Sequence, residues 1–138
     1  MIDKEIIKIA SNTENHGVLN NHTHFSKLKN AICGDEMKIY LIVENSNIVK
    51  FKYECESCIY CQASVSLLSR KAKNKSIENL KYFIKQAKNC FEKNTNSFDK
   101  DWKDFDNIMI KKNISRKECL LLPLNTTLDA LDKKIYEI

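Results

Sequence analysis

Glycine, proline and long apolar runs are scarce in this sequence. Its 138 residues include only two glycines and one proline, which argues against collagen-like segments, repeats and flexible linkers. No stretch of about 18 apolar residues occurs, so we expect no membrane-spanning helix. The opening residues MIDKEIIKIASN contain neither the continuous apolar core nor the cleavage site of a secretory signal. These absences together predict a cytoplasmic protein.

The rest of the composition is typical of a folded domain. Hydrophobic residues make up 43% of the chain and charged residues 30%, and the length suits one domain, so we expect residues 1–138 to form a single domain. The net charge is +5, but the lysines are scattered along the chain. Nucleic-acid binding would require a basic stripe with interleaved aromatic residues, so nucleic acid is not an expected partner.

The hydrophobic pattern predicts an α+β fold. Residues 37–43 alternate in character, a turn-forming ENSN cluster follows, and a second β-rich run ends near Tyr53, which together indicate an antiparallel hairpin. Because helical patterns flank this hairpin on both sides, we expect helices packed on one sheet face. The predicted helices are residues 2–11, residues 59–73 with Ser57 as N-cap, a helix starting at Ser76, a short piece around Trp102 and Phe105, and a last helix after Cys119 with Pro123 in its first turn.

Six cysteines are the most unusual feature of an intracellular chain of this length. They stand at positions 33, 55, 58, 61, 90 and 119. In a reducing compartment such cysteines favour metal or thiol chemistry over disulfides. The positions do not form two C-x2-C knuckles, so a zinc ribbon is not indicated.

Three of the cysteines form a C-x2-C-x2-C run, in the stretch CESCIYC. Bacterial ferredoxins begin their cluster loop in this way, so an electron carrier that uses Cys55, Cys58 and Cys61 is one hypothesis. No cysteine followed by proline supplies a fourth ligand, and a helix over residues 59–70 would point the thiols in different directions. We therefore expect Cys58 to be functional, with Cys55 and Cys61 as neighbours that could offer substitute thiolates or a resolving thiol.

A different set of cysteines lies at the boundaries of predicted elements. Cys33 precedes the hairpin in CGD, Cys58 lies where the hairpin meets a helix, and Cys119 precedes the last helix. A helix N-terminus lowers a cysteine pKa and favours the thiolate. Three such thiolates with Asp35 would form a tetrahedral site, whose oxygen ligand exchanges more readily than a fourth thiolate. The alternative is that the site only stabilises the fold, as a structural zinc module without transfer activity.

Three other residues can be assigned to structure rather than to chemistry. Cys90 lies on an apolar helical face and is expected in the core. His22 and His24 alternate in a polar segment, where we expect solvated side chains rather than metal ligands.

Several segments resemble the iron–sulfur cluster assembly scaffolds of the NifU/IscU/SufU type, over about residues 4 to 133. CGDEMKIYLIVENSNIVKFKYE resembles the family's C-G-D hairpin, and CIYCQASVSLLS resembles its segment with a cysteine before A-S-x-S. EIIKIASNTENHGVL and SRKECLLLPLNTTLDAL resemble the N-terminal helix and the C-terminal cysteine helix. Three cysteines in this order make the resemblance specific.

Details of the resemblance favour the SufU branch. Cys58 and Cys119 are 61 positions apart, and Arg116 stands three residues before Cys119, as in SufU-like proteins. Glu118 occupies the position where IscU-like proteins place a histidine, and the proline-rich chaperone motif of IscU is absent. Cys55 and Ser57 replace glycines that are usual in the family, and Glu118 could add an oxygen ligand or repel an anionic persulfide.

The resemblance implies a three-stranded antiparallel sheet with helices on one face, and a role in sulfur transfer. A cysteine desulfurase would supply persulfide sulfur, with Cys33 or Cys119 as acceptor and Arg116 assisting. IscU-type proteins build a [2Fe–2S] cluster on the residues that match Cys33, Asp35, Cys58 and Cys119 and pass it to an acceptor. SufU-type proteins hold zinc there and relay sulfur. Whether sulfurtransferase activity makes the protein an enzyme stays open.

Overall fold

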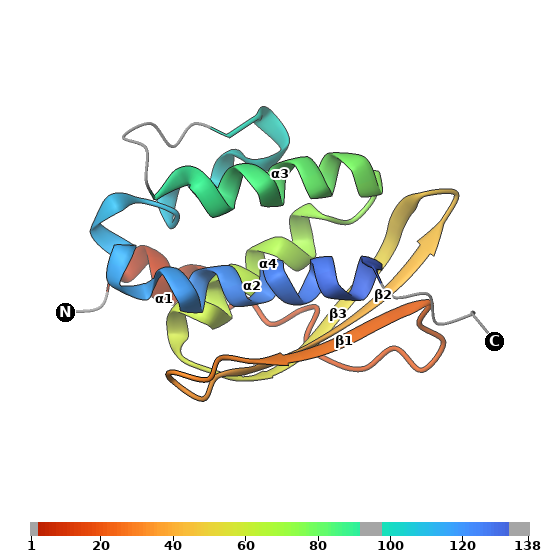
Figure 1. Cartoon of the computed structure of the whole chain (residues 1–138), viewed down its shortest axis with the longest axis horizontal. Helices are drawn as coiled ribbons and strands as arrows, with labels where there is room; N and C mark the ends of the chain where they lie inside the picture. Colours follow the sequence, from red (N-terminus) through yellow and green to blue (C-terminus); the bar gives the residue numbers. More distant parts are fainter. Residues whose placement is uncertain (1–2, 92–97, 133–138) are drawn as a thin grey trace.

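The computed structural model describes residues 3–91 and 98–132, and Figure 1 shows how its elements are arranged. The elements in chain order are α1 (Lys4–Ala10), β1 (His24–Lys29), β2 (Glu36–Glu44), β3 (Asn47–Glu56), α2 (Ile59–Lys71), α3 (Ile77–Cys90), the 3-10 helices η1 (Lys100–Asn107) and η2 (Lys111–Arg116), and α4 (Lys117–Asp132). The predicted order of helix, sheet and helices is confirmed.

The sheet has three antiparallel strands in the order β1-β2-β3. β2 and β3 form the predicted hairpin. Its turn holds Asn45 and Ser46 at φ values of 52° and 65°, the left-handed conformation that two-residue hairpin loops require. The ENSN cluster suits this turn because asparagine tolerates a positive φ better than most residues.

The helices cover one face of this sheet, as Figure 1 shows. Met37, Ile39 and Leu41 of β2 point toward them and have no exposed surface. α2 lies at the centre of the helical layer, against α1, α4 and β3, and seven consecutive residues from Ala63 to Ser69 are buried. The α+β fold with helices on one sheet face is confirmed.

The opposite face of the sheet carries a second, smaller apolar cluster. Leu19, from the segment before β1, packs there on Tyr40 and Ile42. The Tyr40 hydroxyl donates a hydrogen bond of 2.8 Å to Glu54, and burial together with this carboxylate raises the pKa of Tyr40 to about 12. The long segment between α1 and β1 thus shields part of this face.

His22 belongs to this shielding segment and His24 is the first residue of β1; both are half-buried, so neither side chain is fully solvated as expected. The His22 ring lies on the rings of Phe25 and Tyr40, with centroids 5.6 Å apart in each case. Burial lowers the pKa of His24. His22 therefore serves packing on the sheet.

An aromatic cluster attaches α3 to η1. Phe83 stacks on Trp102 with ring centroids 4.2 Å apart and an interplanar angle of 4°. The Trp102 indole N–H donates to the Asn79 side chain at 2.7 Å. The predicted helical piece around Trp102 and Phe105 is confirmed as η1. Cys90 at the end of α3 is buried, as expected, and burial raises its pKa to about 11.

One predicted N-cap and one predicted helix start are wrong, whereas α2 begins at Ile59 as predicted. Cys58, not Ser57, is the N-cap of α2, because Asp35 accepts the Cys58 backbone N–H and fixes the corner one residue later. α4 begins at Lys117, so Cys119 lies in its first turn and Pro123 in its second. The helix tolerates the hydrogen bond that Pro123 cannot donate because the leucines around it are buried. The first and second helices also end earlier than predicted, at Ala10 and Lys71.

The aromatic cluster leads to a stability prediction. Phe83→Ala removes a fully buried ring that stacks on Trp102, so we expect it to lower the free energy of unfolding by roughly 3–5 kcal/mol. The control is the neighbouring Tyr82→Ala, whose side chain is 58% exposed, with an expected loss below about 1 kcal/mol. Urea denaturation measures both, and equal losses would contradict the packing described.

Candidate metal centre

The loop between β1 and β2 presents Cys33 and Asp35. Asn30 starts this loop: its backbone N–H donates to the Asp35 carbonyl at 2.7 Å, and its side chain accepts the Ile32 N–H at 2.9 Å. Gly34 then adopts a φ of +79°, which glycine allows without strain. The tight turn leaves Cys33 exposed and turns Asp35 into the protein.

Two other parts of the chain meet this loop. Cys58 lies at the corner between β3 and α2, and Cys119 lies in the first turn of α4. The Cys33 and Cys119 sulfurs and an Asp35 carboxylate oxygen all lie within 4.8 Å of one another. Residues from three distant segments therefore converge, as the sequence predicted for these three.

Cys58 stands beside this group of three. Its backbone N–H donates to Asp35 Oδ1 at 3.2 Å, and its thiol lies close enough to Cys119 to influence the titration of that thiol. Its sulfur is not among the ligand atoms that lie within 4.8 Å of each other. The structure therefore brings Cys58 next to the group, with its backbone N–H bonded to Asp35 and its thiol beside Cys119.

A hydrogen bond between helices holds the thiol-bearing segments together. The Ser64 hydroxyl of α2 donates to the Leu120 carbonyl of α4 at 2.7 Å, and both groups are buried. Leu120 directly follows Cys119, so this bond fixes the first turn of α4 against α2. The serines of the A-S-x-S stretch thus have a structural role, since Ser66 similarly donates to the Asn12 carbonyl at 2.6 Å.

The Asp35 carboxylate is buried with half of its acceptor capacity unused. Asp35 is 7% exposed, and its Oδ2 is buried without a hydrogen-bond partner among the described residues. An unpaired buried carboxylate oxygen is costly unless a cation or donor satisfies it. Two nearby thiols are the ligands that zinc and iron–sulfur clusters prefer. This donor set fits a bound metal.

The predicted lowering of the Cys119 pKa by the helix N-terminus is wrong. Burial raises the pKa of Cys119, and a hydrogen bond with Cys58 and the negative charges of Cys58, Cys33 and Asp35 raise it further. Crowded acidic groups resist ionising together, and a cation among them reverses that balance. The same crowding that disfavours a free thiolate therefore favours a metal.

Cys55 and Cys61 lie on the other side of Cys58. Burial raises the pKa of both thiols, and the Ser57 hydroxyl acts in the opposite direction on both. Neither residue belongs to the group formed by Cys33, Asp35 and Cys119. The three cysteines of the C-x2-C-x2-C run do not gather as ligands in the described structure, which disfavours the ferredoxin hypothesis.

The predicted sulfur-assisting residue Arg116 is exposed. Its guanidinium lies over the Tyr60 ring, 5.2 Å from the centroid, and Tyr60 is in the first turn of α2, two residues after Cys58. This contact holds a positive charge over the first turn of α2. Glu118 is also exposed, and it is not part of the ligand group found among the described residues.

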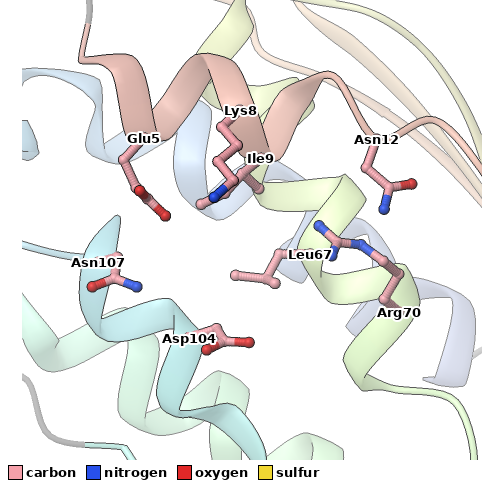
Figure 2. Close-up of a pocket in the computed structure, with 8 residues that line it drawn as sticks. All are labelled: Glu5, Lys8, Ile9, Asn12, Leu67, Arg70, Asp104 and Asn107. Atoms are coloured by element: carbon pink, nitrogen blue, oxygen red, sulfur yellow. The ribbon is translucent and has the colours of Figure 1, made fainter.

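A pocket of about 310 Å³ lies away from these cysteines, between α1, α2 and η1. Figure 2 shows charged groups of both signs around it, including Glu5, Lys8, Arg70 and Asp104. None of the residues that line this pocket is a cysteine. The thiols of the candidate site therefore lie outside this pocket.

The chain matches the NifU-like N terminal domain family over residues 1–96, and it therefore belongs to this family. The match includes Cys33, Asp35 and Cys58. Cys119 lies beyond it, so the place of Cys119 in the site depends on the fold that brings it to Cys33 and Asp35.

Named relatives extend over nearly the whole chain. The iron–sulfur cluster assembly scaffold protein IscU of Thermotoga maritima is 28% identical over 137 residues, which cover 96% of this chain and 94% of that protein. A similar solved structure is a putative iron–sulfur cluster assembly scaffold protein for the SUF system from Fervidobacterium islandicum, with a TM-score of 0.86, 25% identity and coverage of 95% and 96%. That similarity agrees with the SufU-like features of the sequence.

The fold has a further solved counterpart. The N-terminal part of a NifU-like protein from Brucella abortus superposes with a TM-score of 0.89 at 19% identity, covering 99% of this chain and 95% of that one. This similarity supports the three-stranded sheet and its helical layer. Separately, no helix of the described segments has the length and apolar character needed to cross a bilayer.

Sequence reasoning missed two residues that build the site. Asn30 organises the turn, and an asparagine four residues before a glycine in a loop is a usable signal for such a turn. Ser64 joins α2 to α4 across the core, and only the three-dimensional structure shows its partner. Ser57 is predicted as a cap, whereas Cys58 takes that position and the Ser57 hydroxyl is buried without a hydrogen-bond partner among the described residues.

The site leads to a prediction about zinc affinity. Cys33→Ser, Cys58→Ser, Cys119→Ser and Asp35→Ala should each lower zinc affinity at least about tenfold, because each removes a donor from the predicted set. Competition with a chromophoric chelator under anaerobic conditions measures this affinity.

Cys55→Ser and Cys61→Ser are the matched controls, and they should leave zinc affinity within about twofold of the parent chain. If these two variants lose the metal while Cys33→Ser and Cys119→Ser keep it, the converging-loop site is wrong and the run from residue 55 to 61 holds the metal.

Proposed function

We propose that the chain is an iron–sulfur cluster assembly protein that accepts persulfide sulfur from a cysteine desulfurase. Its family includes an assembly scaffold of Thermotoga maritima. The observation that carries the proposal is the convergence of Cys33, Asp35 and Cys119 within 4.8 Å. Thiols from separate segments, together with a carboxylate that has a free oxygen, suit a site that must bind a metal or cluster and later release it.

The exposure of the thiols suggests how sulfur enters. Cys33 is exposed on its loop, whereas Cys119 is 6% exposed. Sulfur passes when a thiolate attacks the terminal sulfur of the incoming persulfide, and this attack requires access. We therefore assign the first acceptance of sulfur to Cys33, with Cys119 as a neighbour to which the sulfur can pass.

Four residues would hold a metal or a [2Fe–2S] cluster: Cys33, Asp35, Cys58 and Cys119. Bound zinc would keep the coordinating thiols deprotonated. An assembled cluster would be cargo, passed on to an acceptor protein. The buried and unpaired Asp35 oxygen supports this ligand set, and the carboxylate can leave more readily than a thiolate.

Arg116 is positioned to assist the transfer without binding metal. Its guanidinium rests on Tyr60 at 5.2 Å and keeps a positive charge over the first turn of α2, which follows Cys58. A persulfide is anionic at neutral pH, so this charge would attract it, while the exposed Glu118 would oppose it. Arg116 is thus a positioning residue in this proposal.

A second candidate function is a zinc-dependent sulfur relay that builds no cluster. The similarity to the solved protein of the SUF system and the SufU-like place of Arg116 favour it. The scaffold and the relay both accept persulfide sulfur. They differ in what leaves the chain, which is an assembled cluster for the scaffold and sulfur for the relay. Iron and sulfide added anaerobically to the zinc-free chain distinguish them, because only a scaffold forms a cluster with visible absorption.

The shared step gives a direct test. Addition of the chain to a cysteine desulfurase with L-cysteine should raise turnover several-fold and place a persulfide on the chain, detectable by mass spectrometry. Cys33→Ser should abolish the stimulation, because the exposed acceptor is gone. Arg116→Ala should lower it by about two- to tenfold while zinc affinity is unchanged.

Arg116→Lys is the matched control, because it keeps the charge and should restore most of the stimulation if the charge is what matters. A structural zinc module would stimulate no desulfurase, and its chain would unfold when zinc is removed. Either result would contradict the proposed function.

A further inference from the structure

Ile32 is the most exposed large apolar side chain among the described residues. Five such side chains are exposed, and four of them lie between 46% and 58% exposed, whereas Ile32 is 88% exposed. Ile32 packs in neither of the two apolar clusters that the described residues form. The fold therefore derives no apolar burial from this isoleucine, and a polar residue would suit the same position.

The place of Ile32 in the chain connects it with the candidate site. Ile32 directly precedes Cys33 in the loop between β1 and β2, and the Cys33 side chain is exposed as well. Consecutive Cα atoms are about 3.8 Å apart. A protein that brings a reacting atom to the Cys33 sulfur therefore also meets the Ile32 side chain.

The tip of this loop stands clear of the rest of the described protein. A Cβ atom placed on Gly34 would meet no atom within 4 Å beyond its chain neighbours, so the space on the other side of Cys33 is open too. Cys33 thus lies on a convex tip, between an exposed isoleucine and an open glycine. A convex tip of this kind fits a concave partner surface.

Hydrogen bonds hold the loop in one conformation around Ile32. The Ile32 N–H donates to the Asn30 side chain at 2.9 Å, and the Gly34 N–H donates to the Asn30 carbonyl at 2.7 Å. The β-branched side chain of isoleucine also has few rotamers. Because the residue has little conformational freedom to lose, binding through Ile32 costs little entropy.

We propose that Ile32 is an apolar anchor that docks the protein donating persulfide sulfur to Cys33. This inference rests on the proposed function and specifies the partner, which must present an apolar recess beside its persulfide. Insertion of Ile32 into that recess would hold the Cys33 sulfur against the terminal sulfur of the persulfide. Ile32 is a positioning residue, and it takes no part in the exchange of sulfur.

A second copy of this chain fits the position of Ile32 less well than a sulfur donor does. Two copies that pair through Ile32 would cover Cys33, the adjacent exposed thiol, and attack on a persulfide requires that this thiol be accessible. A donor that covers the loop brings the persulfide with it. The loop tip is therefore assigned to the donor.

Steady-state kinetics test the anchor, with the cysteine desulfurase that the parent chain stimulates and the chain as the varied substrate. Ile32→Ser should raise the half-saturating concentration of the chain at least about tenfold, because burial of one isoleucine side chain changes affinity by roughly this factor. Turnover at saturation should stay within about twofold of the parent value, since Cys33 is unchanged. Ile32→Leu should restore most of the affinity, because it keeps the apolar volume.

Val18→Ser is the matched control. It removes a β-branched aliphatic side chain that is 47% exposed and lies before β1, outside the loop that carries Cys33. The half-saturating concentration of this variant should stay within about twofold of the parent value.

Free cysteine persulfide provides a second readout, because a small donor needs no docking. Mass spectrometry should show that Ile32→Ser takes up sulfur on Cys33 at the rate of the parent chain. This result would also show that the variant is folded and that its Cys33 remains reactive.

Three results would overturn the anchor. The first is an unchanged half-saturating concentration for Ile32→Ser. The second is an equal loss of uptake from free cysteine persulfide, which would place the effect of Ile32 on Cys33 itself. The third is a parent chain that sediments as a dimer while Ile32→Ser sediments as a monomer, which would assign Ile32 to a contact between copies. The proposed function fails separately: the parent chain itself would then stimulate no desulfurase, and the anchor would fall with it.

Discussion

The buried carboxylate of Asp35 is the constraint on which the rest of the site depends. Its Oδ1 accepts the Cys58 N–H and thereby joins the β1–β2 loop to the start of α2. Its Oδ2 has no hydrogen bond from the described residues, and one of its carboxylate oxygens lies with the Cys33 and Cys119 sulfurs. A fold that buries half of a carboxylate unpaired gains from a cation at this place.

The helical layer holds the segments that carry Asp35, Cys58 and Cys119 in place. α2 is buried along seven consecutive residues, and the Ser64 hydroxyl ties it to α4 beside Cys119. Small serines allow the two helices to approach while their hydroxyls satisfy carbonyls of neighbouring segments. The site can therefore present an exposed Cys33 on a short loop while its other members stay fixed by the core.

The sequence predicted the hairpin, the helical layer and the convergence of Cys33, Asp35 and Cys119, because alternation and cysteine order are local signals. It did not predict the raised pKa of Cys119, the helical start at Lys117 or the burial of the Ser57 hydroxyl. These depend on burial and on contacts between distant segments, such as the leucines that hold Pro123 inside α4. Cys55 and Cys61, predicted as neighbours of Cys58, lie outside the group formed by Cys33, Asp35 and Cys119.

X-ray absorption at the zinc edge of the zinc-loaded chain tests the central claim most directly, because it counts the ligand atoms. The account predicts three sulfur ligands at about 2.3 Å and one oxygen at about 2.0–2.2 Å, from Cys33, Cys58, Cys119 and Asp35. An Asp35→Cys variant should convert this shell to four sulfurs. Four sulfurs in the parent chain, or a shell without sulfur, would contradict the site.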